Sequence, residues 1–180
     1  MKIMGIDAAL TRTGLAYPDG STGLIRTKDG GGDGRLLHIR DHLAVALLDA
    51  WPDLVILEDI RAGLKGASAR QIPMVHGAVR VELLSRGFPY VEVNPSTLKA
   101  YALGRTGDKA AMIMAAYKRS GVEFTDDNEC DAAWLRWLGL DWAGEPAFPL
   151  PAAQRARLER VDWTPATRAG LRPRSPQNAA

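Results

Sequence analysis

The sequence of 180 residues contains a single cysteine and no long run of apolar residues. Cys130 alone excludes an internal disulfide and any zinc site built from several cysteines, which agrees with a reducing compartment. No segment approaches the roughly 20 apolar residues that cross a bilayer, and the N-terminus lacks a basic stretch followed by a long apolar run. We therefore expect a cytoplasmic protein without a membrane partner.

Charge is unevenly distributed, although the formal net charge is only +2. Residues 151–180 carry a net charge of +4 from six arginines, Glu159 and Asp162, which leaves −2 for residues 1–150. A basic segment attached to a slightly acidic body suggests a polyanionic partner. A solvated, disordered end rich in proline and alanine explains the same composition. Composition alone leaves both interpretations open.

Hydrophobic patterning predicts an α/β fold. A chain of this length with 46% hydrophobic residues can form one domain around one core. Short β-branched segments predict strands, and apolar residues at three- and four-residue spacing predict helices. The predicted strands are 2–7, 13–17, 23–27, 53–59 and 89–93, and the predicted helices are 36–51, 71–86, 95–103, 107–119 and 127–140. Three strands in a meander, followed by alternating helices and strands, predict a mixed sheet flanked by helices.

Two of the predicted strands are apolar but end in acidic residues. Asp7 closes the first strand, and Glu58 closes the apolar run in DLVILED. An unpaired carboxylate is costly to bury or must take up a proton, so a strand directed at the interior normally excludes it. If strands 2–7 and 53–59 are parallel neighbours, Asp7 and Glu58 meet at the carboxyl edge of the sheet, where sites in open α/β sheets usually lie.

A third acidic group lies in the predicted helix 127–140. Asp127 and Asp131 are four residues apart, and Asn128 and Asp131 are three apart, so all three can share one helix face. Like charges this close repel unless they are protonated or bridged by cations. Mg²⁺ or Mn²⁺ would neutralise them, and two ions about 3.5–4 Å apart can activate a water and stabilise the leaving oxygen of a phosphodiester. Each acid alone is explained as a strand end or helix cap, but three at comparable positions favour a metal site.

Four segments carry a family resemblance. They are GIDAALTRTGLAY, the strand ending VILEDI, NPSTLKAYALGRTGDKAAM and DDNECDAAWL, and they span about residues 1–140. Together and in this order they resemble the RuvC-like Holliday junction resolvases, including phage and poxvirus relatives. The first segment alone also resembles the phosphate loop of actin-like sugar kinases, so the resemblance depends on all four.

The resemblance implies an RNase H-like fold, which we assign to residues 1–145. Composition marks residues 146–180 as a Pro/Arg-rich C-terminal tail. The resemblance also implies a homodimer that presents two active sites to a four-way DNA junction and makes paired nicks. The implied cofactor is Mg²⁺, for which Mn²⁺ substitutes, with two ions in each active site. The implied location is the nucleoid, or the host cytoplasm if the protein is phage-encoded.

Site residues transfer from the resemblance position by position. Asp7, Glu58 and Asp131 match the family's metal-binding acids. Lys99 and Lys109 match its two lysines, which would hold the scissile phosphate or stabilise its developing charge. Without the resemblance, both lysines read as ordinary solvated helix residues.

Two positions depart from the family pattern. Asn128 stands where the family commonly has its fourth carboxylate. Asn128 could offer its carbonyl oxygen, or Asp127 or Glu129 could supply the charge, and side-chain direction favours Asp127. Arg61 stands in the loop where bacterial members carry an aromatic residue that opens the junction, so a broader specificity for branched DNA is plausible.

Basic residues near the predicted site are candidates for DNA contacts. They are Arg61, Lys65, Arg70, Arg80 and Arg105, which lie on loops or helices beside the predicted site. Such residues could follow the phosphate backbone without reading bases, although scattered lysines and arginines are also the normal content of a protein surface.

The sequence thus predicts a metal-dependent endonuclease that hydrolyses phosphodiesters in branched DNA, with Holliday junctions as the leading substrate. One alternative is a catalytically silent module that binds branched DNA, which the asparagine at position 128 favours. Another is a lobe of an actin-like ATPase or sugar kinase. That alternative requires two lobes and a second phosphate motif, which this sequence does not supply.

Overall fold

The computed structural model describes residues 1–28, 32–60 and 63–173. Its sheet consists of β1 (Ile3–Asp7), β2 (Arg12–Ala16), β3 (Thr22–Arg26), β4 (Leu54–Glu58) and β5 (Tyr90–Val93), in the order β3-β2-β1-β4-β5. The pairs β1–β2 and β2–β3 are antiparallel, whereas β1–β4 and β4–β5 are parallel. The predicted mixed sheet, a three-stranded meander with two parallel strands, is confirmed.

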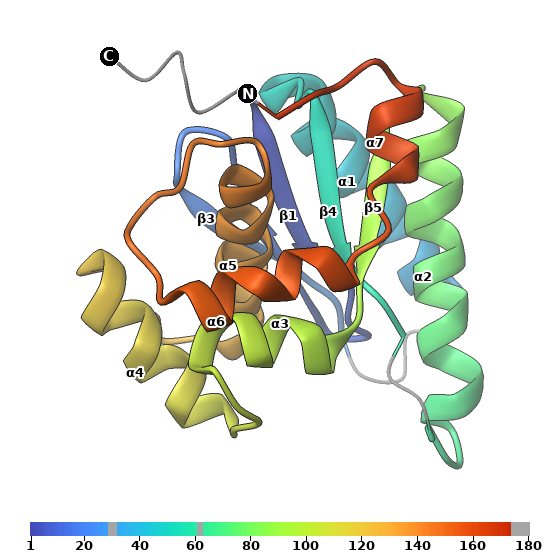
Figure 1. The fold of residues 1–180 in the computed structure, drawn as a ribbon. Helices are drawn as coiled ribbons and strands as arrows, with labels where there is room; N and C mark the ends of the chain where they lie inside the picture. Colours follow the sequence, from blue (N-terminus) through green and yellow to red (C-terminus); the bar gives the residue numbers. More distant parts are fainter. Residues whose placement is uncertain (29–31, 61–62, 174–180) are drawn as a thin grey trace.

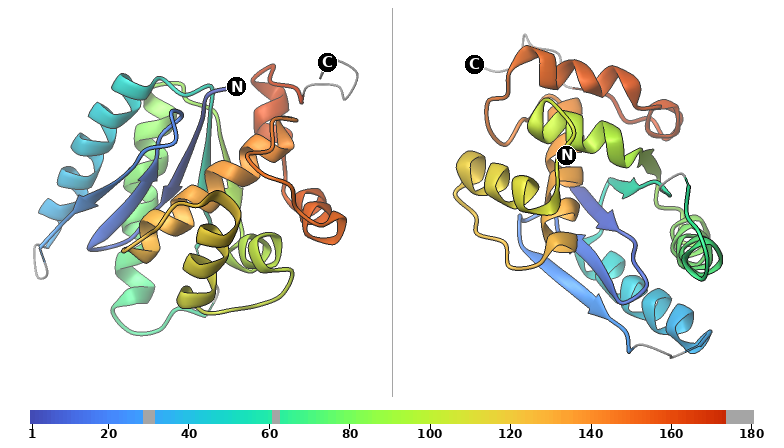
Figure 2. Two further views of the ribbon diagram at one scale, coloured as in Figure 1. Left: turned by 90° about the vertical axis from the view of Figure 1, so that its left-hand side faces the viewer. Right: turned by 90° about the horizontal axis from the view of Figure 1, so that it is seen from below.

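Helices cover both faces of this sheet (Figures 1 and 2). One face carries α1 (Gly34–Ala50) and α2 (Ser68–Ser85), and the other carries α3 (Pro95–Leu103), α4 (Lys109–Ser120) and α5 (Asp127–Trp142). Strand residues alternate between the two layers, so Ile6 packs on the α1–α2 side and Ile3 on the α5 side. Each of these elements begins and ends within three residues of its predicted bounds.

Local signals explain where the helices that carry the two predicted lysines begin. The Asn94 side chain accepts a hydrogen bond from the backbone N–H of Ser96 at 2.9 Å and caps α3. The Asp108 side chain accepts from the N–H of Ala111 at 2.8 Å and caps α4. Gly121 ends α4 in the left-handed region with φ 75°. Lys109 is therefore the first residue of α4, directly after its cap.

Helix α5 lies unusually close to the backbone of β1 and β2. A Cβ atom on Gly5 would stand 2.0 Å from the carbonyl oxygen of Ala132, and one on Gly14 would stand 2.0 Å from that of Asn128. Only glycine leaves room for the helix at these two positions. The first turns of α5 consequently lie directly over the carboxyl end of β1.

The C-terminal segment packs onto the same layer of helices. It comprises α6 (Ala152–Arg155), the 3-10 helix η1 (Ala156–Arg160) and α7 (Thr164–Arg168), and it crosses α3 before reaching β5 (Figure 1). Val161 and Ala166 are buried in the core that surrounds α5. The guanidinium of Arg155 donates to both carboxylate oxygens of Asp141, at 2.9 and 3.1 Å. The division at residue 145 stays a prediction, but the packed segment is not the disordered end that composition allowed.

Candidate active site

Asp7 and Glu58 are neighbours at the carboxyl edge of the sheet. In the parallel pairing of β1 and β4, Ile6 lies beside Leu57. The next residues, Asp7 and Glu58, therefore end the two strands side by side. Because Ile6 and Leu57 pack on the α1–α2 side, the side chains of Asp7 and Glu58 face α5. Asp7 is only 7% exposed.

Helix α5 brings the third acid to this edge. The carboxylate of Asp126 caps the helix by accepting from the N–H of Asn128 at 2.9 Å. The guanidinium of Arg12, at the start of β2, donates to the same carboxylate at 2.9 Å and ties the helix end to the sheet. Asp127 and Asp131 lie in the first turns of the capped helix. We refer to Asp7, Glu58 and Asp131 as the carboxylate cluster.

Burial and mutual repulsion perturb all three members of the carboxylate cluster. The pKa of Asp7 is raised well above its usual value by burial, by the charges of Glu58 and Asp131, and by a hydrogen bond with Glu58. Burial, with the charge of Asp131, raises the pKa of Glu58 to about 7. Burial, with the charge of Asp127, raises the pKa of Asp131 to about 6. The cluster therefore retains protons at a pH where exposed carboxylates are ionised.

The two predicted lysines both lie near these acids. Lys109 forms an ion pair with Asp127. Burial raises the pKa of Asp127, but the hydrogen bond with Lys109 and its charge, together with a backbone hydrogen bond and the charge of Arg12, outweigh burial and hold this pKa below its usual value. The charge of Lys99 acts on Glu58 and Asp131 and partly offsets the rise in their pKa values. Both ammonium groups thus flank the edge of the sheet where the carboxylate cluster lies.

The donor chemistry of this site suits a hard divalent cation. Oxygen ligands from β1, β4 and α5 carry like charges that repel, which a cation would relieve. Across the described ranges, no three Asp, Glu, His or Cys side chains already stand in positions that could hold a metal ion. Instead, Asp7 and Glu58 share a hydrogen bond, which requires a proton, and Lys109 pairs with Asp127. The residues fit Mg²⁺ or Mn²⁺ by type, after side-chain adjustment.

The three candidates for a fourth ligand differ in their surroundings. The charge of Asp127 contributes to the pKa shifts of Asp7 and Asp131, so its carboxylate lies within their electrostatic reach. Glu129 accepts a hydrogen bond from the Thr22 hydroxyl at 3.5 Å and so leans toward β3. Asn128 contributes its backbone carbonyl to the close contact over Gly14.

The predicted DNA-contacting residues differ in their surroundings. Lys65, Arg70 and Arg105 are exposed. Arg80 forms ion pairs with Glu92 and, at 3.6 Å, with Asp59. Arg61 lies outside the described residues.

Sequence reasoning missed the residues that fix α5 in place. The glycines at 5 and 14 are visible in the motifs, but only packing reveals that a helix passes directly over them. Arg12 gave no sequence signal because its partner Asp126 lies 114 residues away.

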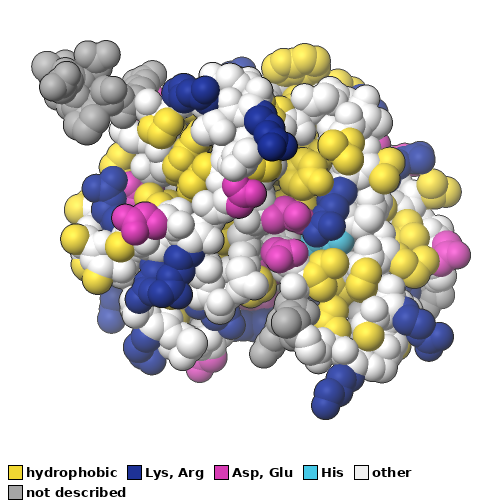
Figure 3. Space-filling view, turned by 45° about the vertical axis from the view of Figure 1, so that its right-hand side comes forward, with side chains coloured by type: hydrophobic (Ala, Val, Ile, Leu, Met, Phe, Trp, Pro, Cys, Tyr) yellow, Lys and Arg dark blue, Asp and Glu magenta, His cyan; other side chains and the backbone are white. Residues whose placement is uncertain are grey.

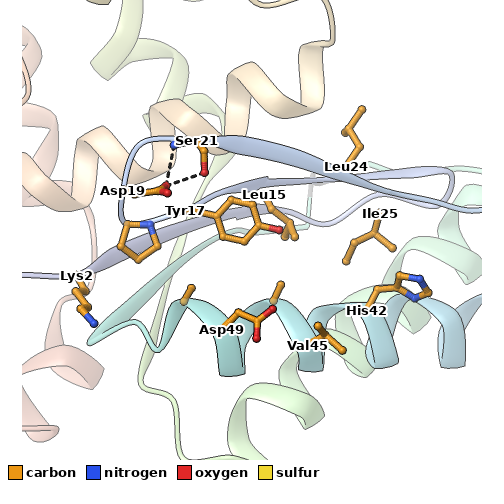
Figure 4. Close-up of a pocket in the computed structure, with 13 residues that line it drawn as sticks. Lys2, Leu15, Tyr17, Asp19, Ser21, Leu24, Ile25, His42, Val45 and Asp49 are labelled. Carbon is orange, nitrogen blue, oxygen red and sulfur yellow. Dashed lines mark hydrogen bonds between the residues drawn. The ribbon is translucent and has the colours of Figure 1, made fainter.

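A cavity of about 1000 Å³ lies on the opposite side of the sheet, between the β2–β3 hairpin and α1 (Figure 4). Leu15, Ile25 and Val45 line it with apolar surface, and Asp49 and Tyr17 add polar groups. The carboxylate cluster is not among its lining residues.

Within the described part of the chain, no helix is both long and apolar enough to cross a membrane.

The strand order and the helices on both faces give an RNase H-like fold with the arrangement seen in RuvC structures. No family model and no curated protein sequence matches the chain. Two solved structures of RuvC from Thermus thermophilus share this fold at 20% sequence identity. One superposes with a TM-score of 0.65 over 83% of this chain and 100% of its own. The other, in complex with a Holliday junction substrate, gives 0.67 over 83% and 99%.

A third similar structure is the yeast mitochondrial Holliday junction resolvase Ydc2. It has 15% identity and a TM-score of 0.47, over 88% of this chain and 80% of its own.

Proposed function

We propose that this protein is a metal-dependent endonuclease that resolves Holliday junctions and related branched DNA by paired phosphodiester hydrolysis. The observation that carries the proposal is the meeting of three buried carboxyl groups from β1, β4 and α5 at one edge of the sheet. Clusters of perturbed acids are frequent at functional sites. The RuvC structure with the same fold was solved with a Holliday junction, which directs the proposal toward branched DNA.

Asp7, Glu58 and Asp131 would hold the cations, with Asp127 or the side-chain oxygen of Asn128 completing the ligand set. Two Mg²⁺ ions, or Mn²⁺ in their place, supply an activated water and stabilise the leaving oxygen when they are bound. Binding at this set requires the carboxylate cluster to lose its shared proton and Asp127 to exchange its partner Lys109.

The lysines would then act on the DNA rather than on the acids. Once released from Asp127, the ammonium of Lys109 can stabilise charge on the scissile phosphate. Lys99 lies on the α3 side of the carboxylate cluster and would hold the same phosphate from another direction.

Exposed basic residues would position the branched DNA around the site. Lys65, Arg70 and Arg105 are proposed to contact backbone phosphates, and Arg61, outside the described residues, is proposed with them. Arg80 was expected in the same role, but its two acidic partners leave it less free for phosphate.

A homodimer would supply the two active sites that paired nicks require. We propose α2 as the interface, because Met74, Val81 and Leu84 are 43%, 61% and 65% exposed on one stripe of this helix. A second copy would cover this stripe isologously.

A silent module that binds branched DNA is the second candidate. Asn128 at the position of a family carboxylate favours it, as does the absence of three ready-placed metal ligands among the described residues.

Incubation of the protein with a labelled four-way junction in Mg²⁺, Mn²⁺ or EDTA tests the proposal. We expect paired nicks near the crossover in either metal and none in EDTA. Junction binding without metal-dependent nicks would establish the silent module instead.

A further inference from the structure

Two polar residues of α2 lie behind the strand ends that carry the carboxylate cluster. His76 and Arg80 are four residues apart and therefore share one face of the helix. His76 is 3% exposed, and the neighbouring Val75 and Val79 are fully buried against the sheet. Figure 3 views this side of the molecule, where acidic, basic and histidine side chains gather around a hollow.

Arg80 connects the ends of β4 and β5. Its guanidinium lies 3.6 Å from the carboxylate of Asp59, the residue that directly follows Glu58. The same guanidinium forms an ion pair with Glu92 of β5. The backbone N–H of Asp59 also donates to the carbonyl of Val93 at 2.9 Å. The backbone that leaves Glu58 is thus held from the α2 side as well as by the sheet.

His76 makes the corresponding contact at the end of β1. A hydrogen bond joins its ring to the backbone of Ala8, the residue that directly follows Asp7. Burial and the charge of Arg80 lower the pKa of His76, and this bond partly offsets that shift. Because the bond favours the protonated ring, the backbone group is an acceptor, the carbonyl oxygen. The ring's Nδ1 is buried and has no hydrogen-bond partner among the described residues. A buried nitrogen without a partner opposes folding, so an apolar side chain of similar volume would be more favourable for stability alone.

We propose that His76 and Arg80 are positioning residues, which hold Asp7 and Glu58 at the separation needed to bind a divalent cation. The inference rests on the proposed function. Mg²⁺ requires near-ideal octahedral geometry with oxygen distances of about 2.0–2.1 Å, so small displacements of a ligand-bearing strand weaken binding. Removing groups that support metal ligands typically lowers metal affinity by about 10–100-fold.

Arg80→Gln and Arg86→Gln form a matched pair of variants for the test. Arg80 lies in the C-terminal half of α2 and Arg86 directly follows the helix. Their exposure is similar, 32% for Arg80 and 34% for Arg86, and both pair with acidic side chains. Arg86 pairs with Glu82 of α2, and among the described residues no hydrogen bond joins its side chain to a strand end. Mn²⁺ affinity is measured on the whole protein from the electron paramagnetic resonance of free Mn²⁺, together with unfolding midpoints and junction affinity in EDTA.

We expect Arg80→Gln to weaken Mn²⁺ binding about tenfold and Arg86→Gln to leave it unchanged. Equal weakening by both variants would mean that loss of helix stability explains the result and would overturn the inference. Unchanged Mn²⁺ affinity in Arg80→Gln would overturn it as well.

His76→Leu and His76→Gln separate positioning from folding. Leucine removes the buried Nδ1, so we expect an equal or higher unfolding midpoint together with about tenfold weaker Mn²⁺ binding. Glutamine can still donate to the Ala8 carbonyl and should restore affinity to within about threefold of the wild type. His76→Leu with wild-type Mn²⁺ affinity overturns the inference alone. A wild-type protein that neither binds Mn²⁺ nor nicks junctions overturns the proposed function and this inference with it.

Discussion

The two faces of the sheet treat adjacent acidic residues in opposite ways. Glu58 and Asp59 are consecutive at the end of β4, yet Glu58 faces α5 whereas Asp59 lies beside Arg80 of α2. On the α2 side, Arg80 compensates both Asp59 and Glu92. On the α5 side, the carboxylate cluster shares protons, and the nearby lysines only partly offset its repulsion.

This difference separates charges that serve the fold from charges that serve a ligand. On the α2 side one arginine, Arg80, forms ion pairs with two acids, so the fold has the means to pair acids with a cation. Leaving three acids to repel one another opposes folding, and such local conflicts occur mainly at functional sites. The uncompensated face is therefore where we place catalysis.

The largest expected effect comes from comparing two single variants, each of which removes one acidic charge from a different face of the sheet. Asp7→Asn should lower the nicking rate about a thousandfold, because several kcal/mol of metal-dependent stabilisation is lost at about 1.4 kcal/mol per factor of ten. Asp59→Asn should lower it less than about tenfold, since it only loosens support behind Glu58. Single-turnover nicking of a labelled junction measures both rates.

Junction affinity in EDTA provides the control for these variants. The Asp7→Asn variant should bind the junction as the wild type does. The substitution changes a buried residue, so the exposed basic residues can still contact DNA and the fold is retained. Equal loss of binding and cutting in Asp7→Asn, or an Asp59→Asn variant that is equally inactive, would break the distinction between the faces.

The close approach of α5 gives the second prediction. Gly14→Ala places a Cβ atom 2.0 Å from the carbonyl oxygen of Asn128, so the start of α5 must move away from β2. A displacement of about 1 Å at a reacting centre can cost about a hundredfold in rate, and we expect a loss of this size in nicking.

Gly23→Ala is the matched control for Gly14→Ala. Its added Cβ would meet only the Tyr17 ring, at 3.5 Å, in ordinary van der Waals contact. We expect wild-type nicking and an unfolding midpoint near that of the wild type. If Gly14→Ala retains full activity, the exact position of α5 on the sheet does not determine the arrangement of the carboxylate cluster.

Much of the fold was predictable because its signals are local. Apolar runs and three- and four-residue spacing located the strands and helices, and the strand ends at Asp7 and Glu58 indicated the site. The packing of residues 152–168 was not predictable, because it depends on contacts such as that of Arg155 with Asp141 on another helix. His76 gave no signal either, since only the assembled sheet brings it to Ala8.

The raised pKa values predict a particular dependence of stability on pH. The pKa of Glu58 is about 7 in the folded protein against an ordinary value of 4.5, so between these pH values the folded state binds a proton that the unfolded state releases. Without divalent metal, the free energy of unfolding should therefore fall as pH rises from 4.5 to 7. At about 1.4 kcal/mol per pKa unit, and with the proton shared with Asp7, the loss should be roughly 2–3 kcal/mol.

Urea unfolding in EDTA across this pH range measures the slope. Glu58→Gln should flatten it, and saturating Mg²⁺ should do the same in the wild type, because a bound cation replaces the proton. If Glu58→Gln leaves the pH dependence of the unfolding free energy unchanged, protonation of Glu58 is not the cause of that dependence.

The smallest expected effect concerns the basic C-terminal segment. Arg160→Gln combined with Arg168→Gln removes two exposed charges from a segment that lies on the α5 side of the sheet (Figure 2). Each phosphate contact contributes about 0.9 to the slope of log affinity against log salt, so the slope should fall by about 1–2. Lys118→Gln with Arg119→Gln removes the same charge from the last turn of α4 and should leave the slope unchanged. Equal slopes in all three proteins would show that the segment serves the core through Val161 and Ala166 and contacts no DNA.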